Sequence, residues 1–123
     1  MSAGYKDFKI EAGTTWSAVI DWQDSSGVGI NLTSRTLTGK IKRRVLDPTE
    51  IVSFTITKAD QGTNPGRFTI ALSATDTAKF PVKQTSDGKK DTLELSYDIE
   101  SASGGVVDRI LEGLILVSPE VTK

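Results

Sequence analysis

Three carboxylates near the end of the chain are the residues best placed by type and spacing to do chemistry. Glu94, Asp98 and Glu100 fall on the same side of the alternating segment TLELSYDIE. A glycosidase needs two carboxylates about 5 to 9 Å apart across a cleft, which makes a carboxylate-only glycosidase one hypothesis. The apolar residues between them favour a simpler interpretation, in which the carboxylates are the solvated face of a half-buried strand. We favour the second interpretation and expect the chain not to be an enzyme.

Other catalytic chemistry is restricted because the chain contains no histidine and no cysteine. Their absence excludes Ser-His-Asp and Cys-His catalysis, zinc sites built on imidazole or thiolate, and disulfides. The stretches DSSGVG and QGTNPG do not lead from a buried strand into a helix with a lysine, so they do not match phosphate-binding loops. We predict no metal site, no cofactor and no small-molecule substrate.

A short basic run, KIKRR, offers a second kind of chemistry, the binding of anions. On a strand, Lys40, Lys42 and Arg44 would project from one face as a positive stripe that suits phosphate groups. No exposed aromatic residues interleave with the stripe for base stacking. We therefore expect either a solvated strand face or a salt-bridged contact with an acidic neighbouring protein, and no specific nucleic acid.

The two tryptophans allow a sugar-binding interpretation. Trp16 and Trp22 share one face of the alternating run TWSAVIDWQ with an alanine and an isoleucine. Exposed tryptophans could form platforms for a sugar, with Asp21 as a polar partner, which would make the chain a carbohydrate-binding β-sandwich module. The shared apolar face favours a place in the core for both rings.

Length and charge limit the partners further. With 123 residues the chain is long enough for one hydrophobic core, and we expect a single domain over residues 1–123. Fifteen Lys and Arg against sixteen Asp and Glu leave a net charge of -1, so no general field attracts nucleic acid or an anionic membrane. The segment MSAGYKDFKIEAG lacks the pattern of an export signal, and no stretch is apolar enough to cross a bilayer. We predict no membrane partner.

The elements that must position these residues are short β-strands. Period-two alternation and turn residues predict about eight strands and one helical turn, which begins at Ser73 or Thr75 and ends before Pro81. The clearest strands lie at residues 15–23, 30–32, 35–44, 52–56, 67–73, 92–100 and 109–117. Strands of this length, separated by Gly, Pro, Asp and Ser, favour an all-β fold, an antiparallel β-sandwich or a small barrel.

Several segments in succession resemble small structural proteins of tailed bacteriophages. The opening GTTWSAVIDWQDSSGVGINLTSRTLTGKIKRR is similar to their Trp-bearing strand, turn and Asn/Asp-Leu-Thr-Gly step, with Ser34 in place of the glycine. GRFTIALSATDTAKF resembles a later segment with the pattern Ile-x-Leu-Ser, and LELSYDIESASGGVVDRILEGLILVSPEVTK resembles the closing one. The chain is also similar to the immunoglobulin-like N-terminal domain of phage baseplate upper proteins.

The resemblance implies an immunoglobulin-like β-sandwich that works as a non-enzymatic component of the virion. Such a component would bind neighbouring virion proteins and copies of itself in symmetric positions, most naturally in the tail, baseplate or neck. A capsid decoration protein is the alternative within the same class. The implied location is the virion, assembled in the cytoplasm of the host bacterium.

For this structural function we expect contacts at strand edges and at both ends of the chain. An N-terminal arm, residues 1–8 with Tyr5 and Phe8, and a C-terminal tail, residues 118–123 with Val121, are the candidate segments. Arms of this kind can add a strand to the open sheet edge of a neighbour.

The most apolar stretch of the chain, RILEGLILVSPEVTK, lies close to its end. In a strand, Leu111, Gly113, Ile115 and Val117 share one face, which we predict to be the core face. The other face would carry the following residues: Ile110, Glu112, Leu114 and Leu116. Two leucines on an outward face need a cover, either a second layer of the same chain or a neighbouring subunit.

Overall fold

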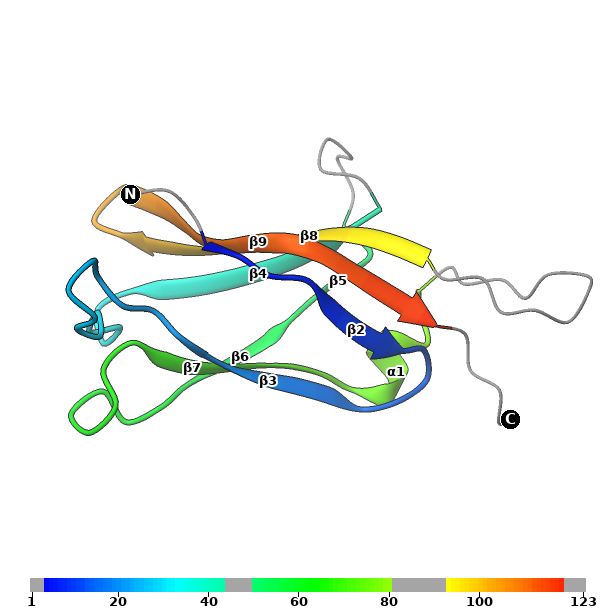
Figure 1. Cartoon of the computed structure of the whole chain (residues 1–123), viewed down its shortest axis with the longest axis horizontal. Coiled ribbons are helices and arrows are strands. Elements are labelled where there is room, and N and C mark those ends of the chain that lie inside the picture. The colour runs from blue at the N-terminus through cyan, green and yellow to red at the C-terminus, as the bar shows by residue number, and fades with distance from the viewer. Residues whose placement is uncertain (1–3, 44–49, 81–92, 119–123) are drawn as a thin grey trace, which may run out of the picture.

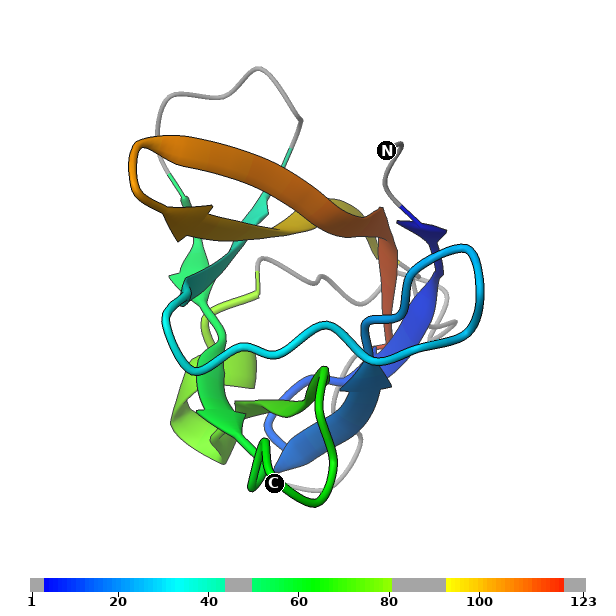
Figure 2. The ribbon, with the colours of Figure 1, turned by 90° about the vertical axis from the view of Figure 1, so that its left-hand side faces the viewer.

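Two β-sheets lie face to face and enclose the apolar side chains of both (Figure 1, Figure 2). The computed structural model describes residues 4–43, 50–80 and 93–118. The larger sheet has the strand order β1-β9-β8-β4-β5, with β2 also paired to β9, and the smaller has the order β3-β7-β6. One short helix, α1, follows β7. The sandwich, rather than the small barrel, is therefore the observed architecture.

The described part of the chain forms nine strands and one helix. The larger sheet contains β1 (Gly4–Tyr5), β2 (Phe8–Glu11), β4 (Thr36–Lys42), β5 (Val52–Ser53), β8 (Leu93–Ser103) and β9 (Val106–Ser118). The smaller contains β3 (Trp16–Asp21), β6 (Thr55–Lys58) and β7 (Arg67–Leu72), and the helix is α1 (Ala74–Thr77). All strand pairs are antiparallel except those of β1 and β2 with β9.

The topology is that of an immunoglobulin-like sandwich. Strands β3, β7 and β6 pair as the B, E and D strands do, and β4, β8 and β9 pair as C, F and G. Strand β5 adds the short C′ position beside β4. Two hallmarks of antibody domains are missing, because the chain has no cysteine for the B–F disulfide and β4 turns Gly39 and Ile41 inward instead of a tryptophan.

The alternation of apolar residues correctly predicted the core faces of most strands. Phe68 and Ile70 of β7 are fully buried, as are Ile41 of β4 and Leu95 and Ile99 of β8. Their polar neighbours in the chain point to the outer faces. Side chains alternate between the two sides of a strand, so a period of two in the sequence becomes one apolar face per sheet.

One predicted strand is in fact two strands in different sheets. Residues 52–56 were expected to form a single strand, but β5 pairs with β4 whereas β6 pairs with β7. The chain changes sheets at Phe54, whose side chain is buried and whose N–H donates to the Gly39 carbonyl over 2.9 Å. A Cβ atom on Gly39 would lie 2.8 Å from the Phe54 ring, so the glycine leaves the space that this ring occupies.

The expected strand at residues 30–32 is instead an extended loop segment. Leu32 is fully buried, but its N–H donates to the Gln61 side-chain oxygen over 3.0 Å rather than to a strand. The same oxygen accepts a hydrogen bond from Gly66 N–H over 2.9 Å. Gln61 thus satisfies the backbone of two loops that would otherwise be unpaired at this end of the sandwich.

The expectation of an N-terminal arm at residues 1–8 is wrong from Gly4 onward. Strands β1 and β2 run parallel to β9, with Gly4 opposite Leu111 and Phe8 opposite Ile115. Phe8 is only 8% exposed, so its side chain belongs to the core and is not a surface contact. The alternation of Phe8 with Ile10, which is also buried, directs both side chains inward beside β9.

The closing strand follows the predicted pattern from Leu111 to Val117. Leu111, Gly113, Ile115 and Val117 are all buried, as expected for the core face. Ile110, which was expected to point outward, is also buried. The register between β8 and β9 shifts here, because Ile99 is opposite Leu111 whereas Glu100 is opposite Arg109. This bulge inserts Ile110 as an extra residue and breaks the alternation.

Four aromatic rings from separate segments pack against one another between the two sheets. Phe8 contacts Trp16 edge-on, with 5.0 Å between ring centroids, and lies 5.4 Å from Tyr97. Phe54 completes the cluster at 6.0 Å from Trp16 and 5.9 Å from Tyr97. Because Trp16 comes from the smaller sheet and Tyr97 from the larger, these rings join the two layers.

The predicted helical turn is confirmed, with Ser73 rather than Thr75 at its start. The Ser73 hydroxyl accepts from Asp76 N–H over 3.1 Å, and the Asp76 carboxylate accepts from Ser73 N–H, which is a capping box. Thr77 is fully buried and donates its hydroxyl hydrogen to the Thr14 carbonyl over 2.8 Å. Pro81, expected to end the turn, lies outside the described residues.

Replacing Phe8 tests whether the first strands are part of the core. We expect Phe8→Ala to lower the free energy of unfolding by about 3–5 kcal/mol, because it removes a buried ring from the aromatic cluster. Tyr5→Ala is the matched control, since Tyr5 is 66% exposed and its loss should change stability by no more than about 0.5 kcal/mol. Urea unfolding measures both, and equal effects would contradict the observed placement.

The buried phenol of Tyr97 predicts a loss of stability at high pH. Burial raises the pKa of Tyr97 above its ordinary value of 10.0, so the folded state keeps this phenol neutral. The neutral Tyr97 phenol makes its full contribution to the free energy of unfolding below about pH 10, where tyrosine in the unfolded chain is also neutral. That contribution falls as the pH rises above this value. Unfolding free energies from pH 8 to about 11 should therefore fall less steeply for Tyr97→Phe. Lysines also lose their protons at high pH, but they do so equally in the variant and the wild type. An identical pH dependence of the unfolding free energy in the two proteins would therefore contradict the raised pKa of Tyr97.

Candidate functional site

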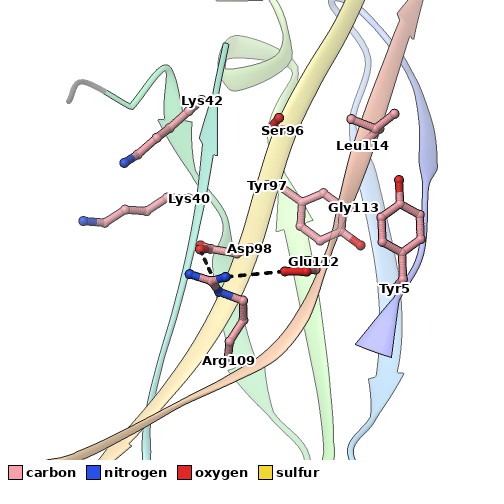
Figure 3. A pocket seen from close by; sticks show the side chains of 10 residues that line it. All are labelled: Tyr5, Lys40, Lys42, Ser96, Tyr97, Asp98, Arg109, Glu112, Gly113 and Leu114. Atoms are coloured by element: carbon pink, nitrogen blue, oxygen red, sulfur yellow. Dashed lines mark hydrogen bonds and ion pairs between the residues drawn. The ribbon is translucent and has the colours of Figure 1, made fainter. Parts of the chain in front are cut away.

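The outer face of the larger sheet carries a shallow hollow, which we call the outer hollow (Figure 3). Its volume is about 200 Å³. It is lined by Tyr5, Lys40, Lys42, Ser96, Tyr97, Asp98, Arg109, Glu112, Gly113 and Leu114. Four of the contact residues predicted from the sequence, Tyr5, Lys40, Lys42 and Leu114, thus line one site although they come from three strands.

The strand register arranges the outward side chains in two rows across the sheet. In the first row Tyr5 is opposite Glu112, Glu112 opposite Asp98, and Asp98 opposite Lys40. In the second row Leu114 is opposite Ser96, and Ser96 opposite Lys42. Paired residues on one face of a sheet have neighbouring side chains. The rows therefore place the apolar residues on the β9 side and the lysines on the β4 side.

Arg109 holds the two carboxylates of the first row. Its Nε lies 3.5 Å from Asp98 Oδ2, and its Nη1 lies 3.5 Å from Glu112 Oε2 (Figure 3). All three side chains are partly exposed, so these ion pairs contribute little to stability. Sequence reasoning treated Asp98 as a solvated carboxylate, and the structure adds the guanidinium that balances it.

Lys40 and Lys42 form no ion pair with any of the described residues. Their aliphatic stems border the outer hollow, and their ammonium groups point away from Ser96 (Figure 3). Long basic side chains commonly place an apolar stem on the surface and keep the charge in water. Arg44, predicted as the third member of the stripe, lies outside the described residues.

The apolar side of the outer hollow depends on how β1 meets β9. The Lys6 N–H donates to the Glu112 carbonyl over 3.0 Å, and the Asp7 carboxylate accepts from Leu114 N–H over 2.9 Å. The same carboxylate raises the pKa of Tyr5 through a hydrogen bond. A Cβ atom on Gly113 would lie 2.0 Å from the Lys6 carbonyl oxygen, so only glycine permits this close approach.

The remaining predicted contacts do not join the outer hollow. Leu116 lies on the same face, opposite Lys9, and is half-buried as Leu114 is. The described part of the chain therefore does not fully cover either leucine. Val121 lies outside the described residues, and Phe8 is in the core.

The tryptophans are placed in or against the core, as the sequence favoured. Trp22 is buried, and the Arg35 guanidinium carbon lies 5.0 Å from the centre of its ring. Trp16 is half-buried between Phe8 and Phe54. Asp21, the proposed polar partner for a sugar, is bonded to Arg67 at 2.9 Å, which raises the pKa of that guanidinium. Both tryptophans and Asp21, the residues proposed to bind a sugar, thus make their contacts within the chain.

The three carboxylates of TLELSYDIE point outward from β8, as expected of a solvated face. Glu94 is exposed, Glu100 is half-buried opposite Thr38, and Asp98 is paired with Arg109. Among the described residues, His, Cys, Asp and Glu side chains form no group of three that could hold a metal ion. The described residues also contain no helix that is long and apolar enough to span a membrane.

Comparisons with known proteins do not indicate a function for this chain. No known protein family and no curated protein matches the chain. Among solved structures, it is similar to the NK cell receptor Nkp44, described as a triggering partner in natural cytotoxicity. The identity is 14% and the TM-score 0.43, over 96% of this chain and 100% of the receptor chain. A likeness this weak carries no information about function.

The contact at Gly113 predicts how the outer hollow can be disrupted. We expect Gly113→Ala to force Lys6 away from β9, to lower the free energy of unfolding by about 1–3 kcal/mol and to speed hydrogen exchange of the Leu114 amide. Gly62→Ala is the control, since its Cβ would meet only the Asp60 side chain at 3.4 Å. Unchanged Leu114 exchange in Gly113→Ala, measured by NMR, would disprove the proposed contact.

Proposed function

We propose that this protein is a non-enzymatic structural component of a tailed-phage virion, which binds neighbouring virion proteins in several copies. The ordered resemblance of its segments to small phage structural proteins supports this function. The same resemblance favours a position in the tail, baseplate or neck over one on the capsid surface. Its immunoglobulin-like sandwich is a suitable carrier for contact surfaces on the outer faces of two sheets.

The single observation that carries the proposal is the outer hollow. Tyr5, Lys40, Lys42 and Leu114 are four of the candidate protein contacts named from the sequence, and all four border it. Pockets for small molecules enclose most of a ligand and measure about 300 to 1,000 Å³. The outer hollow is smaller, at about 200 Å³, and lies on an open sheet face. Such a surface is better suited to a side chain of another protein than to a substrate.

The charge pattern of this face is a second support. Asp98 and Glu112 each lie 3.5 Å from a nitrogen of Arg109, so one guanidinium partly balances both carboxylates. The retaining mechanism of a glycosidase would require both carboxylates on one sugar. Carboxylates paired with an arginine on an exposed face instead form a charge pattern that a partner protein can recognise.

Particle composition tests the proposal directly. Virions of the phage that encodes this chain, purified by density gradient, should contain it in a fixed ratio to the tail proteins by quantitative mass spectrometry. A reconstruction should place it at symmetric positions on the tail side. Intact infectious particles that lack the chain would overturn the proposal. Density on the capsid surface would contradict the tail position and favour capsid decoration.

A further inference from the structure

We propose that the outer hollow binds an extended segment of a neighbouring protein that carries an aliphatic side chain and, about four residues later, two carboxylates. This inference rests on the proposed function and specifies the chemistry of the partner. It follows from the order in which the rows of the sheet present their side chains. A segment that follows the second row meets Leu114 first, the Ser96 hydroxyl next and Lys42 last. In the first row Glu112 and Asp98, both paired with Arg109, lie between Tyr5 and Lys40.

The apolar end of the path is formed by Tyr5 and Leu114. Tyr5 is 66% exposed, and Leu114 is half-buried on the neighbouring strand, β9. An exposed aromatic ring beside a partly covered leucine leaves apolar surface in contact with water. Covering that surface with an aliphatic side chain is favourable by about 25 cal/mol for each Å² buried.

The opposite end has an excess of positive charge. Lys40 and Lys42 are unpaired among the described residues, while Asp98 and Glu112 are already balanced in part by Arg109. The lining residues therefore carry three cations against two carboxylates. The whole chain has a net charge of -1, so this excess is local. Carboxylates are the protein groups that complement two free ammonium groups at this end.

The width of the sheet sets the spacing within the partner segment. From β1 the path crosses β9 and β8 to reach β4, which is three strand spacings. At about 4.8 Å for each spacing the path is about 14 Å long. An extended chain advances about 3.3 Å per residue, so a leucine at one end is followed by carboxylates about four residues later. The Ser96 hydroxyl lies between Leu114 and Lys42 and can donate to or accept from the backbone of the segment.

A second copy of this chain is the less suitable occupant. Its corresponding face carries the same lysines and the same excess of positive charge. A symmetric contact places a surface against itself, and like charges brought together oppose such pairing. A neighbouring protein of different sequence avoids this repulsion.

NMR titration of the full ¹⁵N-labelled chain tests the proposal with a defined probe, the peptide acetyl-Leu-Ser-Thr-Ser-Glu-Glu-amide. We expect a Kd of about 1 mM, with shift changes concentrated at Tyr5, Leu114, Ser96, Lys40 and Lys42. Two matched peptides separate the contributions: one has lysines in place of the glutamates, and the other has glycine in place of the leucine. Both should bind at least about fivefold more weakly.

Charge reversal on the protein provides the complementary variants. Lys40→Glu with Lys42→Glu should weaken binding of the acidic peptide at least about tenfold, and higher salt should weaken binding to the wild type. The control is Lys58→Glu with Lys79→Glu, which changes the net charge equally at exposed sites on β6 and just after α1. It should leave the Kd within about twofold. Circular dichroism verifies that both double variants are folded.

The proposal is overturned by any of three results: no saturable shifts up to about 10 mM, equal binding of the three peptides, or shifts located away from the outer hollow. It is also overturned if sedimentation shows the chain associating with itself through a contact that Lys40→Glu with Lys42→Glu removes. None of these results would change the particle composition that tests the structural function. Absence of the chain from virions together with peptide binding would instead reject that function alone.

Discussion

The packing of Phe8 against Trp16 and Tyr97 is the contact on which the rest of the structure depends. It fixes β2 beside β9, and it joins the two sheets in a chain that has no cysteine for a disulfide. The position of β1 follows from it, since β1 continues the same parallel pairing toward the N-terminus. The packing of Phe8 in the core, together with the hydrogen bonds of Lys6 and Asp7 to β9, thus holds Tyr5 at the outer hollow.

Local alternation was sufficient to predict the strands that pair with their neighbours in sequence. The faces of β7 and β8 follow directly from the apolar residues at every second position, and Ser73 as a helix cap follows from its hydroxyl. The parallel pairing of Phe8 with Ile115 could not be predicted this way, because no local pattern specifies a partner more than a hundred residues away. The change of sheet at Phe54 was missed for a similar reason, since the alternation continues through it.

The candidate site shows the same division between local and distant information. The outward direction of Lys40 and Leu114 was predicted from their own strands, but their arrangement around one hollow depends on the register of both with β8. Arg109 was not singled out, because its partners Asp98 and Glu112 are brought to it by the bulge and the hairpin. From the sequence, Arg109 is recognisable only as a charged residue that follows a predicted hairpin.

The parallel pairing of the first and last strands has a mechanical consequence. β1 and β2 run in the same direction as β9 (Figure 1), so Gly4 lies opposite Leu111 near the middle of β9, while Ser118 is the last residue of that strand. A force that pulls these two residues apart acts along the strands and perpendicular to their hydrogen bonds. The bonds between β2 and β9 then resist shear together, rather than opening one after another as in a hairpin pulled from its end. The pairing of β2 with β9 therefore resists tension applied between Gly4 and Ser118.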